Sequence, residues 1–304
     1  MAVNNSLTNT KKQAPFSAVI SSEGYKKLIN NTLRDPKRAN RFVANVTSAV
    51  SANPALQKCD AATIVSSALL GESLELSPSP VLGHFYMVPY EDRKNGRTVA
   101  QFQIGYKGLI QLAIRSNQYV DLDAIEIREG EHKGRDKFTG KHIFEFIEDE
   151  TIRANTPTIG YLAYLEMSNG FKHTVYMGHE EMLNHADQYS KAFSKEKFIA
   201  LQDGNIPQSE MWKYSSPWYT GFTGMALKTV MRQLLSKFGC LSIEMQTAIT
   251  SDAGVIRDDG TVDYVDNSAD YAQAEPAPVA VDQSTGEVIE TPAEEDPTAN
   301  FFNQ

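Results

Sequence analysis

Basic and amide side chains recur at four-residue spacing after a glycine near the middle of the chain. Residues 97–104 alternate in character as a strand does, and Gly105 interrupts that pattern. Lys107, Gln111 and Arg115 then share one face of a predicted helix, opposite an apolar face. Backbone N–H groups, the positive end of a helix dipole and a cation would converge there, which is typical of a phosphate site. An ordinary amphipathic helix with solvated polar residues would show the same spacing.

Two later stretches interleave cations with aromatic residues. The first comprises Tyr189, Lys191, Phe193, Lys195 and Lys197, and the second comprises Trp212, Lys213, Tyr214, Trp218, Tyr219, Lys228 and Arg232. Cations can contact phosphates, and aromatic faces can stack on bases without reading their sequence. The pattern therefore favours a single-stranded nucleic acid as the ligand. The alternative is that both tryptophans are core anchors around a loop.

The sequence contains none of the common catalytic motifs that we sought. There is no GxxxxGK[ST] phosphate loop, no HExxH, no GxSxG and no Cys-x-x-Cys pair, and the six histidines are scattered. A metal-dependent nuclease could use carboxylates on neighbouring predicted strands, which are Glu126, Glu129, Glu131, Glu145, Glu148 and Asp149. A solvated sheet face or loop is the favoured interpretation, because the order of elements is not that of a nuclease core and no Lys stands at a clear catalytic spacing. We therefore expect a binding protein and keep the nuclease as an alternative.

Charge is unevenly distributed along the 304 residues, whose formal net charge is −9. Thirteen Asp and Glu residues but one Arg follow Thr250, so the preceding part carries a small positive net charge. A mildly basic body with an acidic tail is typical of a polyanion binder with an interaction tail. Cys59 and Cys240 have no partner spacing for a disulfide framework or a zinc knuckle. No stretch has the length of a membrane span and the N-terminus lacks a signal-like apolar core, so we expect a cytoplasmic protein without a membrane partner.

The elements that must position these residues predict an α+β fold. Three N-terminal helices, two of them capped by Asp35 and Asp60, precede hairpins around the turn dipeptides at 95–96 and 169–170. Strands are also expected at 122–129 and 141–148, with helices at 179–188, 218–238 and 241–250. This order predicts a central antiparallel sheet backed by helices and a long C-terminal helix. We divide the chain into an unstructured N-terminus (1–15), a helical oligomerisation segment (16–76), an α+β core (77–250) and a disordered acidic tail (251–304).

Three segments in this order resemble the RecT family of phage and prophage single-strand DNA annealing proteins. They are QFQIGYKGLIQLAIRS at 101–116, HADQYSKAFS at 185–194 and SPWYTGFTGMALKTVMRQLLSKF at 216–238, preceded by LSPSPVLGHFYMVPY at 76–90. The family pattern carries an acidic residue just before the Phe of the third segment and another shortly after it, where this chain has Gly221 and Gly224. That departure concerns local capping or a polar contact, because the rest of the pattern is kept.

The resemblance implies ATP-independent pairing of complementary strands in phage recombination, by rings or helical filaments of a non-enzymatic protein. It also implies a bent sheet backed by a helix, and cooperation with a 5′-to-3′ exonuclease. The acidic tail is a candidate docking segment for that exonuclease or for the host single-strand binding protein, with Phe301 and Phe302 as anchors. We expect no cofactor, with Mg²⁺ only as an aid to annealing; a duplex-binding scaffold is a further alternative. The predicted DNA-contacting residues are Gln103, Tyr106, Lys107, Gln111, Arg115, Tyr189, Lys191, Lys195, Lys197, Lys213, Trp218, Lys228, Thr229 and Arg232.

Overall fold

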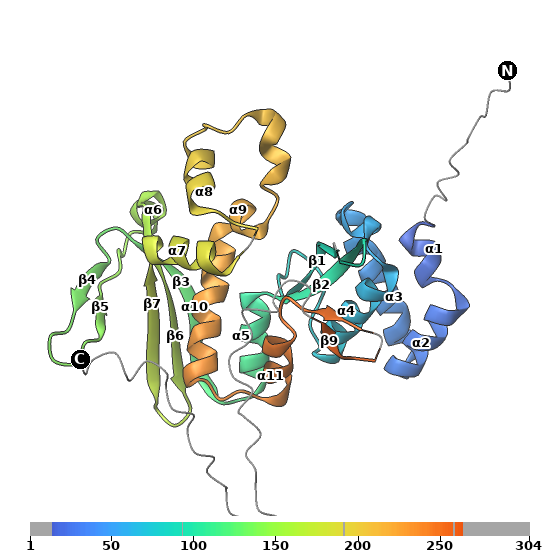
Figure 1. Cartoon of the computed structure of the whole chain (residues 1–304). Helices are drawn as coiled ribbons and strands as arrows, with labels where there is room; N and C mark the ends of the chain where they lie inside the picture. Colours follow the sequence, from blue (N-terminus) through green and yellow to red (C-terminus); the bar gives the residue numbers. More distant parts are fainter. Residues whose placement is uncertain (1–13, 93, 191, 258, 264–304) are drawn as a thin grey trace, which may run out of the picture. The chain divides into compact units, whose positions relative to one another are not determined.

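The computed structural model describes residues 14–92, 94–190, 192–257 and 259–263, and it confirms an α+β fold (Figure 1). The N-terminal helices are α1 (Phe16–Ile20), α2 (Glu23–Leu33), α3 (Pro36–Ala52) and α4 (Ala61–Ser73), with a 3-10 turn η1 (Leu56–Lys58) between the last two. Both predicted caps are confirmed. The Asp35 carboxylate accepts from the backbone N–H of Lys37 at 2.8 Å, and Asp60 accepts from that of Ala62 at 3.1 Å.

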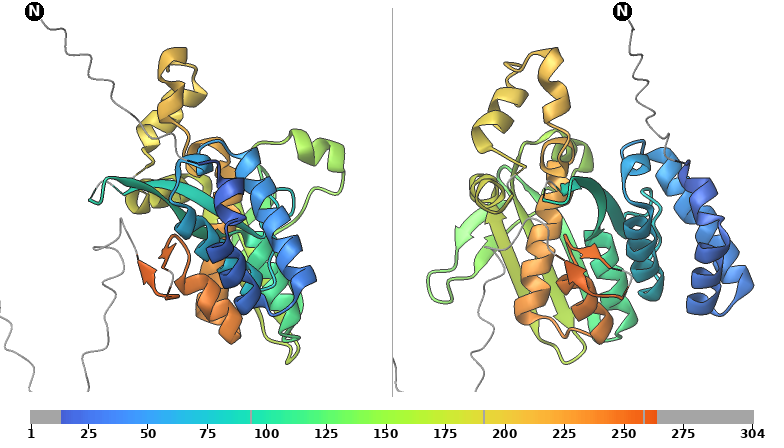
Figure 2. Two further views of the ribbon diagram at one scale, coloured as in Figure 1. Left: turned by 90° about the vertical axis from the view of Figure 1, so that its right-hand side faces the viewer. Right: turned by 45° about the vertical axis from the view of Figure 1, so that its right-hand side comes forward.

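The apolar stripes of these helices are used within the chain. Phe42, Val46 and Val50 of α3 are buried, and so are Ile64 and Ala68 of α4. Helices α1, α3 and α4 pack against one another, and Figure 2 shows them from two further sides. We had assigned self-association to this helical segment. Packing within the chain covers these stripes, so they do not by themselves support that role, and self-association of the segment stays a prediction.

A β-hairpin follows the helices. Strands β1 (Phe85–Asp92) and β2 (Arg97–Ile104) pair antiparallel across the predicted turn, with Phe85 opposite Ile104. Helix α4 packs on β2, where the hydroxyl of Thr63 accepts from the backbone N–H of Ala100 at 2.9 Å. Helix α5 (Tyr106–Arg115) begins directly after β2. The predicted strand–glycine–helix arrangement is thereby confirmed.

The second sheet has three antiparallel strands in the order β3 (Tyr119–Arg128), β6 (Thr158–Met167) and β7 (Lys172–Gly178). Helices α10 (Phe222–Phe238) and α7 (His179–Tyr189) pack against it, as Figure 1 shows. A small hairpin of β4 (His132–Arg135) and β5 (His142–Phe144) and the short helix α6 (Glu150–Asn155) join β3 to β6. The strand predicted at 141–148 covers only His142–Phe144. Beyond it the backbone N–H of Ile147 donates to the Glu131 carboxylate at 3.2 Å instead of to a neighbouring strand.

The chain between α7 and α10 forms α8 (Lys195–Gln202), the 3-10 helix η2 (Gln208–Lys213) and α9 (Pro217–Thr220). The helix predicted at 218–238 is broken at Gly221, whose φ of −151° and ψ of 50° are not helical. Helix α11 (Ile243–Thr250) follows, and β8 (Val255–Ile256) pairs with β9 (Val262–Asp263). Within the described residues no helix is long and apolar enough to cross a bilayer.

The predicted start of the acidic tail is wrong. Ser251, Asp252, Val255 and Ile256 are buried, and the backbone of Phe102 in β2 hydrogen-bonds to residues 253 and 254. Residues 251–256 therefore extend the β1–β2 hairpin instead of forming an independent tail. The rest of the predicted tail from residue 264, and residues 1–13 of the predicted unstructured N-terminus, lie outside the described residues.

Candidate nucleic-acid interface

The junction of β2 and α5 is built around two close backbone approaches. The N–H of Gly105 donates to the carbonyl oxygen of His84 at 2.9 Å. A Cβ atom on Gly105 would lie 2.1 Å from the carbonyl oxygen of Gly83, and one on Gly108 would lie 2.1 Å from that of His84. Both glycines of the GYKG segment are therefore required by packing against the preceding loop. That requirement fixes where α5 begins.

Lys107 is presented at the surface of this junction. Its side chain lies beside the loop at Gly83 and is exposed, whereas Tyr106 and Gln103 are half-buried. Burial and the neighbouring positive charges of Arg115 and Lys107 lower the pKa of His84. The predicted residues Gln103, Tyr106 and Lys107 therefore flank the β2–α5 junction. A cation at the N-terminus of α5 is an arrangement that can bind a phosphate.

Arg115, at the other end of α5, is occupied by the protein itself. Its guanidinium donates to the carbonyl oxygens of Leu74 at 2.7 Å and Glu75 at 2.8 Å, just beyond the end of α4. It thereby satisfies carbonyl groups that α4 leaves without helical partners. Its side chain is still 38% exposed, so one edge remains open to a ligand. Gln111, one turn earlier, is half-buried.

A groove of about 420 Å³ lies between α3 and the loop after α4. It is lined by Arg38, Arg41, Asn45, Glu72, Glu75, Leu76, Ser77 and Pro78. Arg38 is held by the Glu72 carboxylate at 2.6 Å, whereas Arg41 is exposed. Our sequence interpretation missed both arginines, although their spacing of three residues on the polar face of α3 was a signal.

The predicted DNA-contacting cations of α10, Lys228 and Arg232, both bind a carboxylate of the protein itself. Lys228 is buried, and its Nζ lies 2.7 Å from Oδ1 of Asp252; a guanidinium nitrogen of Arg232 lies 3.3 Å from Oδ2. The same carboxylate accepts from the backbone N–H of Ile104 at 3.1 Å, at the end of β2. We had expected Lys228 on a solvated polar face. Instead it joins α10 and the segment after α11 to the β2–α5 junction. The hydroxyl of Thr229 donates to a carbonyl oxygen one turn earlier in α10.

The remaining predicted residues, at 189–218, have different surroundings. Tyr189 and Lys197 are exposed, Lys213 pairs with a glutamate one turn earlier, and Lys191 lies outside the described residues. Lys195 is held by Glu180 and by the amide oxygen of Asn184, so it ties α8 to α7. Trp218 is only 7% exposed and packs against Phe193 and Phe222. The alternative interpretation, that Trp218 is a core anchor, is the correct one.

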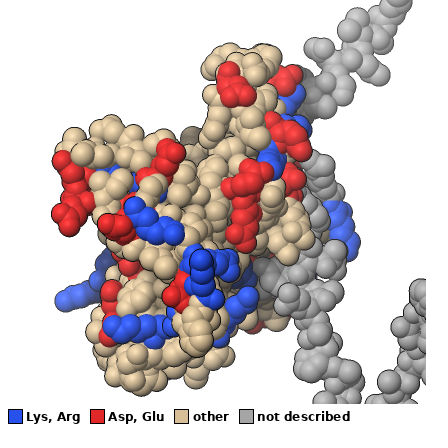
Figure 3. Space-filling view, turned by 90° about the vertical axis from the view of Figure 1, so that its left-hand side faces the viewer, with Lys and Arg blue, Asp and Glu red and all other residues tan. Residues whose placement is uncertain are grey.

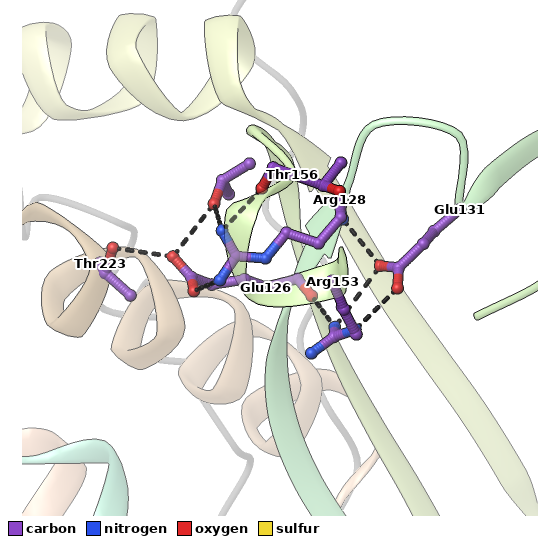
Figure 4. Close-up of polar contacts among 7 residues, drawn as sticks. Glu126, Arg128, Glu131, Arg153, Thr156 and Thr223 are labelled. Atoms are coloured by element: carbon purple, nitrogen blue, oxygen red, sulfur yellow. Dashed lines mark hydrogen bonds and ion pairs between the residues drawn. The ribbon is translucent and has the colours of Figure 1, made fainter. Parts of the chain in front are cut away.

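The strand carboxylates are engaged in a structural network (Figure 4). Glu126 pairs with Arg128 at 2.6 Å and accepts from the hydroxyl of Thr223 at 3.1 Å, which links β3 to the start of α10. Glu131 is fully buried and pairs with Arg153 of α6 at 2.7 Å. Burial by itself would raise the pKa of Glu131, but hydrogen bonds from Arg153 and two backbone N–H groups outweigh it and lower the pKa.

Other predicted carboxylates have local roles. Asp149 caps α6, and Glu145 pairs with Lys133 at 3.4 Å. In the described part of the chain no three Asp, Glu, His or Cys side chains are grouped to hold a metal ion. Four of the six carboxylates that the nuclease alternative invoked, those of Glu126, Glu131, Glu145 and Asp149, are thus engaged in ion pairs or a helix cap.

The face that carries β4, β5 and β7 bears charges of both signs. Figure 3 shows Lys and Arg side chains gathered on its lower part and Asp and Glu side chains on its upper part. Lys172 of β7 pairs with Glu166 at 2.7 Å, and Lys133 pairs with Glu145 as noted above. Exposed cations with carboxylate partners attract a polyanion less than unpaired ones do. The β2–α5 junction is therefore the better candidate interface.

Comparison with known proteins identifies the family. The RecT family model matches residues 40–272, which is most of the chain. The chain belongs to the RecT family. It is 34% identical over 286 residues to the uncharacterised protein YqaK of Bacillus subtilis (strain 168), covering 90% of this chain and 87% of YqaK. It is 28% identical over 265 residues to Protein RecT of Escherichia coli (strain K12), covering 84% and 86% of the two chains. RecT membership supports DNA binding and single-strand annealing in phage DNA recombination.

The RecT-like segments occupy defined places in the fold. The first forms β2 and α5, the second forms the end of α7 and the chain after it, and the third forms α9 and α10. Gly221, one of the two glycines at which the third segment departs from the RecT pattern, is the N-cap residue of α10 and provides no side-chain cap. Thr223 instead fixes the start of α10 through its hydrogen bond to Glu126.

Proposed function

We propose that this RecT-family protein pairs complementary single strands of DNA without ATP, acting as an oligomer along the strand. Annealing is downhill in free energy, so the protein need only hold two strands in register with their bases accessible. The sequence has no phosphate loop of the kind that binds nucleotide triphosphates. The observation that carries the proposal is the β2–α5 junction, where the most distinctive RecT-like segment presents exposed Lys107 beside half-buried Tyr106.

We divide the predicted contact residues that the structure describes into three groups. Lys107, Lys197 and Lys213 are exposed, and we assign them to DNA phosphates together with Arg41 and the open edge of Arg115. Gln103, Tyr106 and Gln111 belong to β2 and α5 and Tyr189 ends α7, and we assign them to contacts with sugars or bases. Lys195, Trp218, Lys228, Thr229 and Arg232 would act indirectly, because each already binds or packs within the fold.

No cofactor is part of this proposal. Mg²⁺ would assist only by screening the repulsion between the phosphates of two approaching strands. We further propose cooperation with a 5′-to-3′ exonuclease and the host single-strand binding protein in the bacterial cytoplasm. Phe301 and Phe302, which we proposed from the sequence as partner anchors, lie outside the described residues.

Annealing can be tested with two complementary oligonucleotides that carry a fluorophore and a quencher, mixed with protein in the absence of nucleotide. The protein should accelerate quenching. Lys107→Ala should weaken single-strand binding and flatten the salt dependence, by about 0.7 in the slope of log K against log salt for one phosphate contact. Lys27→Ala, an exposed lysine on α2, is the matched control.

Other outcomes would point to other functions. Loss of strand length in Mg²⁺ would indicate a nuclease, and preference for duplex over single strands would indicate a scaffold. An unaltered salt slope in Lys107→Ala would remove Lys107 from the interface while leaving annealing itself in place.

A further inference from the structure

One aromatic side chain in the stretch 192–222, that of Trp212, is far more exposed than its aromatic neighbours. In the described residues 192–222, the others are buried or packed together in a cluster, which consists of Phe193, Phe198, Tyr214, Trp218, Tyr219 and Phe222. Trp212 lies in the same stretch but is 73% exposed. An indole has more apolar area to bury than most side chains, yet the fold buries five neighbouring rings, half-buries that of Tyr219 and leaves this one in water.

The exposed indole stands on a fixed support. Trp212 belongs to η2, and the next residue but one, Tyr214, is buried with its ring 5.1 Å from that of Tyr219 in an edge-on contact. The N–H of Tyr214 also donates to the carbonyl oxygen of Met211 at 3.1 Å. The chain directly after Trp212 is therefore anchored to the fold, and a turn bond spans the indole-bearing residue. Little conformational freedom would be lost if a ligand covered the ring.

A cation accompanies the ring. The Nζ atom of Lys213 lies 5.9 Å from the centre of the Trp212 ring, and its side chain is 48% exposed. Its other partner is the Glu210 carboxylate at 3.2 Å, with a side chain that is 45% exposed. Exposed pairs of this kind contribute little to stability, so Lys213 can exchange the carboxylate for a phosphate at small cost.

We propose that Trp212 is a base-stacking site for single-stranded DNA and that Lys213 contacts the adjacent phosphate. This inference rests on the proposed function and adds a site to it. The open face of an indole accepts any base, because every base has a π face, and annealing of arbitrary sequences needs that tolerance. The neighbouring positive charge favours a polyanionic strand over an apolar peptide.

The chain contains two tryptophans, and the other, Trp218, is buried, so quenching by a stacked base is expected from Trp212, and the Trp212→Phe variant isolates the emission of Trp218. The wild-type protein is titrated with oligo(dT), which cannot pair with itself, and saturation is followed independently by anisotropy of a labelled oligonucleotide. Trp emission should fall as the strand binds. Trp212→Phe keeps an aromatic face, so it should bind nearly as tightly while its remaining emission, from Trp218, stays constant.

Trp212→Ala should weaken oligo(dT) binding about 5- to 150-fold, which corresponds to loss of one stacked base. Its melting temperature should match that of Trp212→Phe, because the ring supports no packing. Unchanged emission at saturation would overturn the stacking site, and so would equal affinity of the alanine and phenylalanine variants. If even the wild-type protein binds no single strand, the proposed function is wrong and this inference falls with it.

Discussion

Replacing Lys228 should destabilise the fold, although its position on α10 had suggested a surface contact with DNA. Its side chain is 11% exposed and that of Asp252 is 2% exposed, with 2.7 Å between Nζ and Oδ1. Asp252 also binds Arg232 and the N–H of Ile104, so one carboxylate joins α10, the chain after α11 and the end of β2. Loss of the ammonium group would leave that carboxylate buried and partly unpaired.

The size of the loss in unfolding free energy depends on the partners that Asp252 retains. Breaking a buried ion pair by removing one partner costs about 3–5 kcal/mol. Arg232, at 3.3 Å, and the Ile104 N–H still stabilise the carboxylate, so we expect the lower end, about 3 kcal/mol. Lys228→Met keeps most of the buried apolar part of the side chain, so its effect on the free energy of unfolding measures the loss of the ammonium group. Lys228→Ala should cost more than Lys228→Met, since buried methylenes contribute about 0.8 kcal/mol each.

Urea unfolding followed by far-ultraviolet circular dichroism measures this directly. With a slope of about 3 kcal/mol per molar urea, a loss of about 3 kcal/mol lowers the midpoint by about 1 M. Lys107→Ala, on the exposed end of α5, should stay within about 0.5 kcal/mol of the wild type. A wild-type midpoint for Lys228→Met would refute the buried-pair reasoning. Weakened DNA binding with unchanged stability would restore the direct phosphate contact that we first expected.

Three further predictions test other parts of the fold. Gly105→Ala should lower the melting temperature because its Cβ would meet a loop carbonyl oxygen at 2.1 Å, whereas Gly224→Ala, which meets nothing within 4 Å, should leave it equal or higher. The lowered pKa of Glu131 stabilises the fold above the ordinary carboxyl pKa, and that stability is lost as pH falls through the folded-state value; Glu131→Gln should flatten stability against pH below about pH 4.5 in acid titrations. Truncation after Thr250 removes the buried segment at 251–256 and should lower the melting temperature. Truncation after Asp263 keeps that segment and should leave the melting temperature unchanged. A large drop in the melting temperature of this second variant would contradict the revised boundary.

Local patterns in the sequence determined most of the secondary structure. The caps at Asp35 and Asp60 and the turn dipeptides at 95–96 and 169–170 act through neighbours within a few residues. They therefore fix where helices begin and how hairpin strands pair, whatever lies further along the chain. The RecT-like segments likewise identified the family, because they are read in order along the chain.

Tertiary structure alone decided which polar and aromatic side chains face solvent. Lys107 and Lys228 occur in similar helical patterns, yet one is exposed and the other is buried against Asp252, 24 residues further along. Trp212 and Trp218 are six residues apart, and only the second fits the aromatic cluster. Helical periodicity defines a polar face, but whether a distant carboxylate or ring packs on that face depends on long-range contacts that periodicity does not contain.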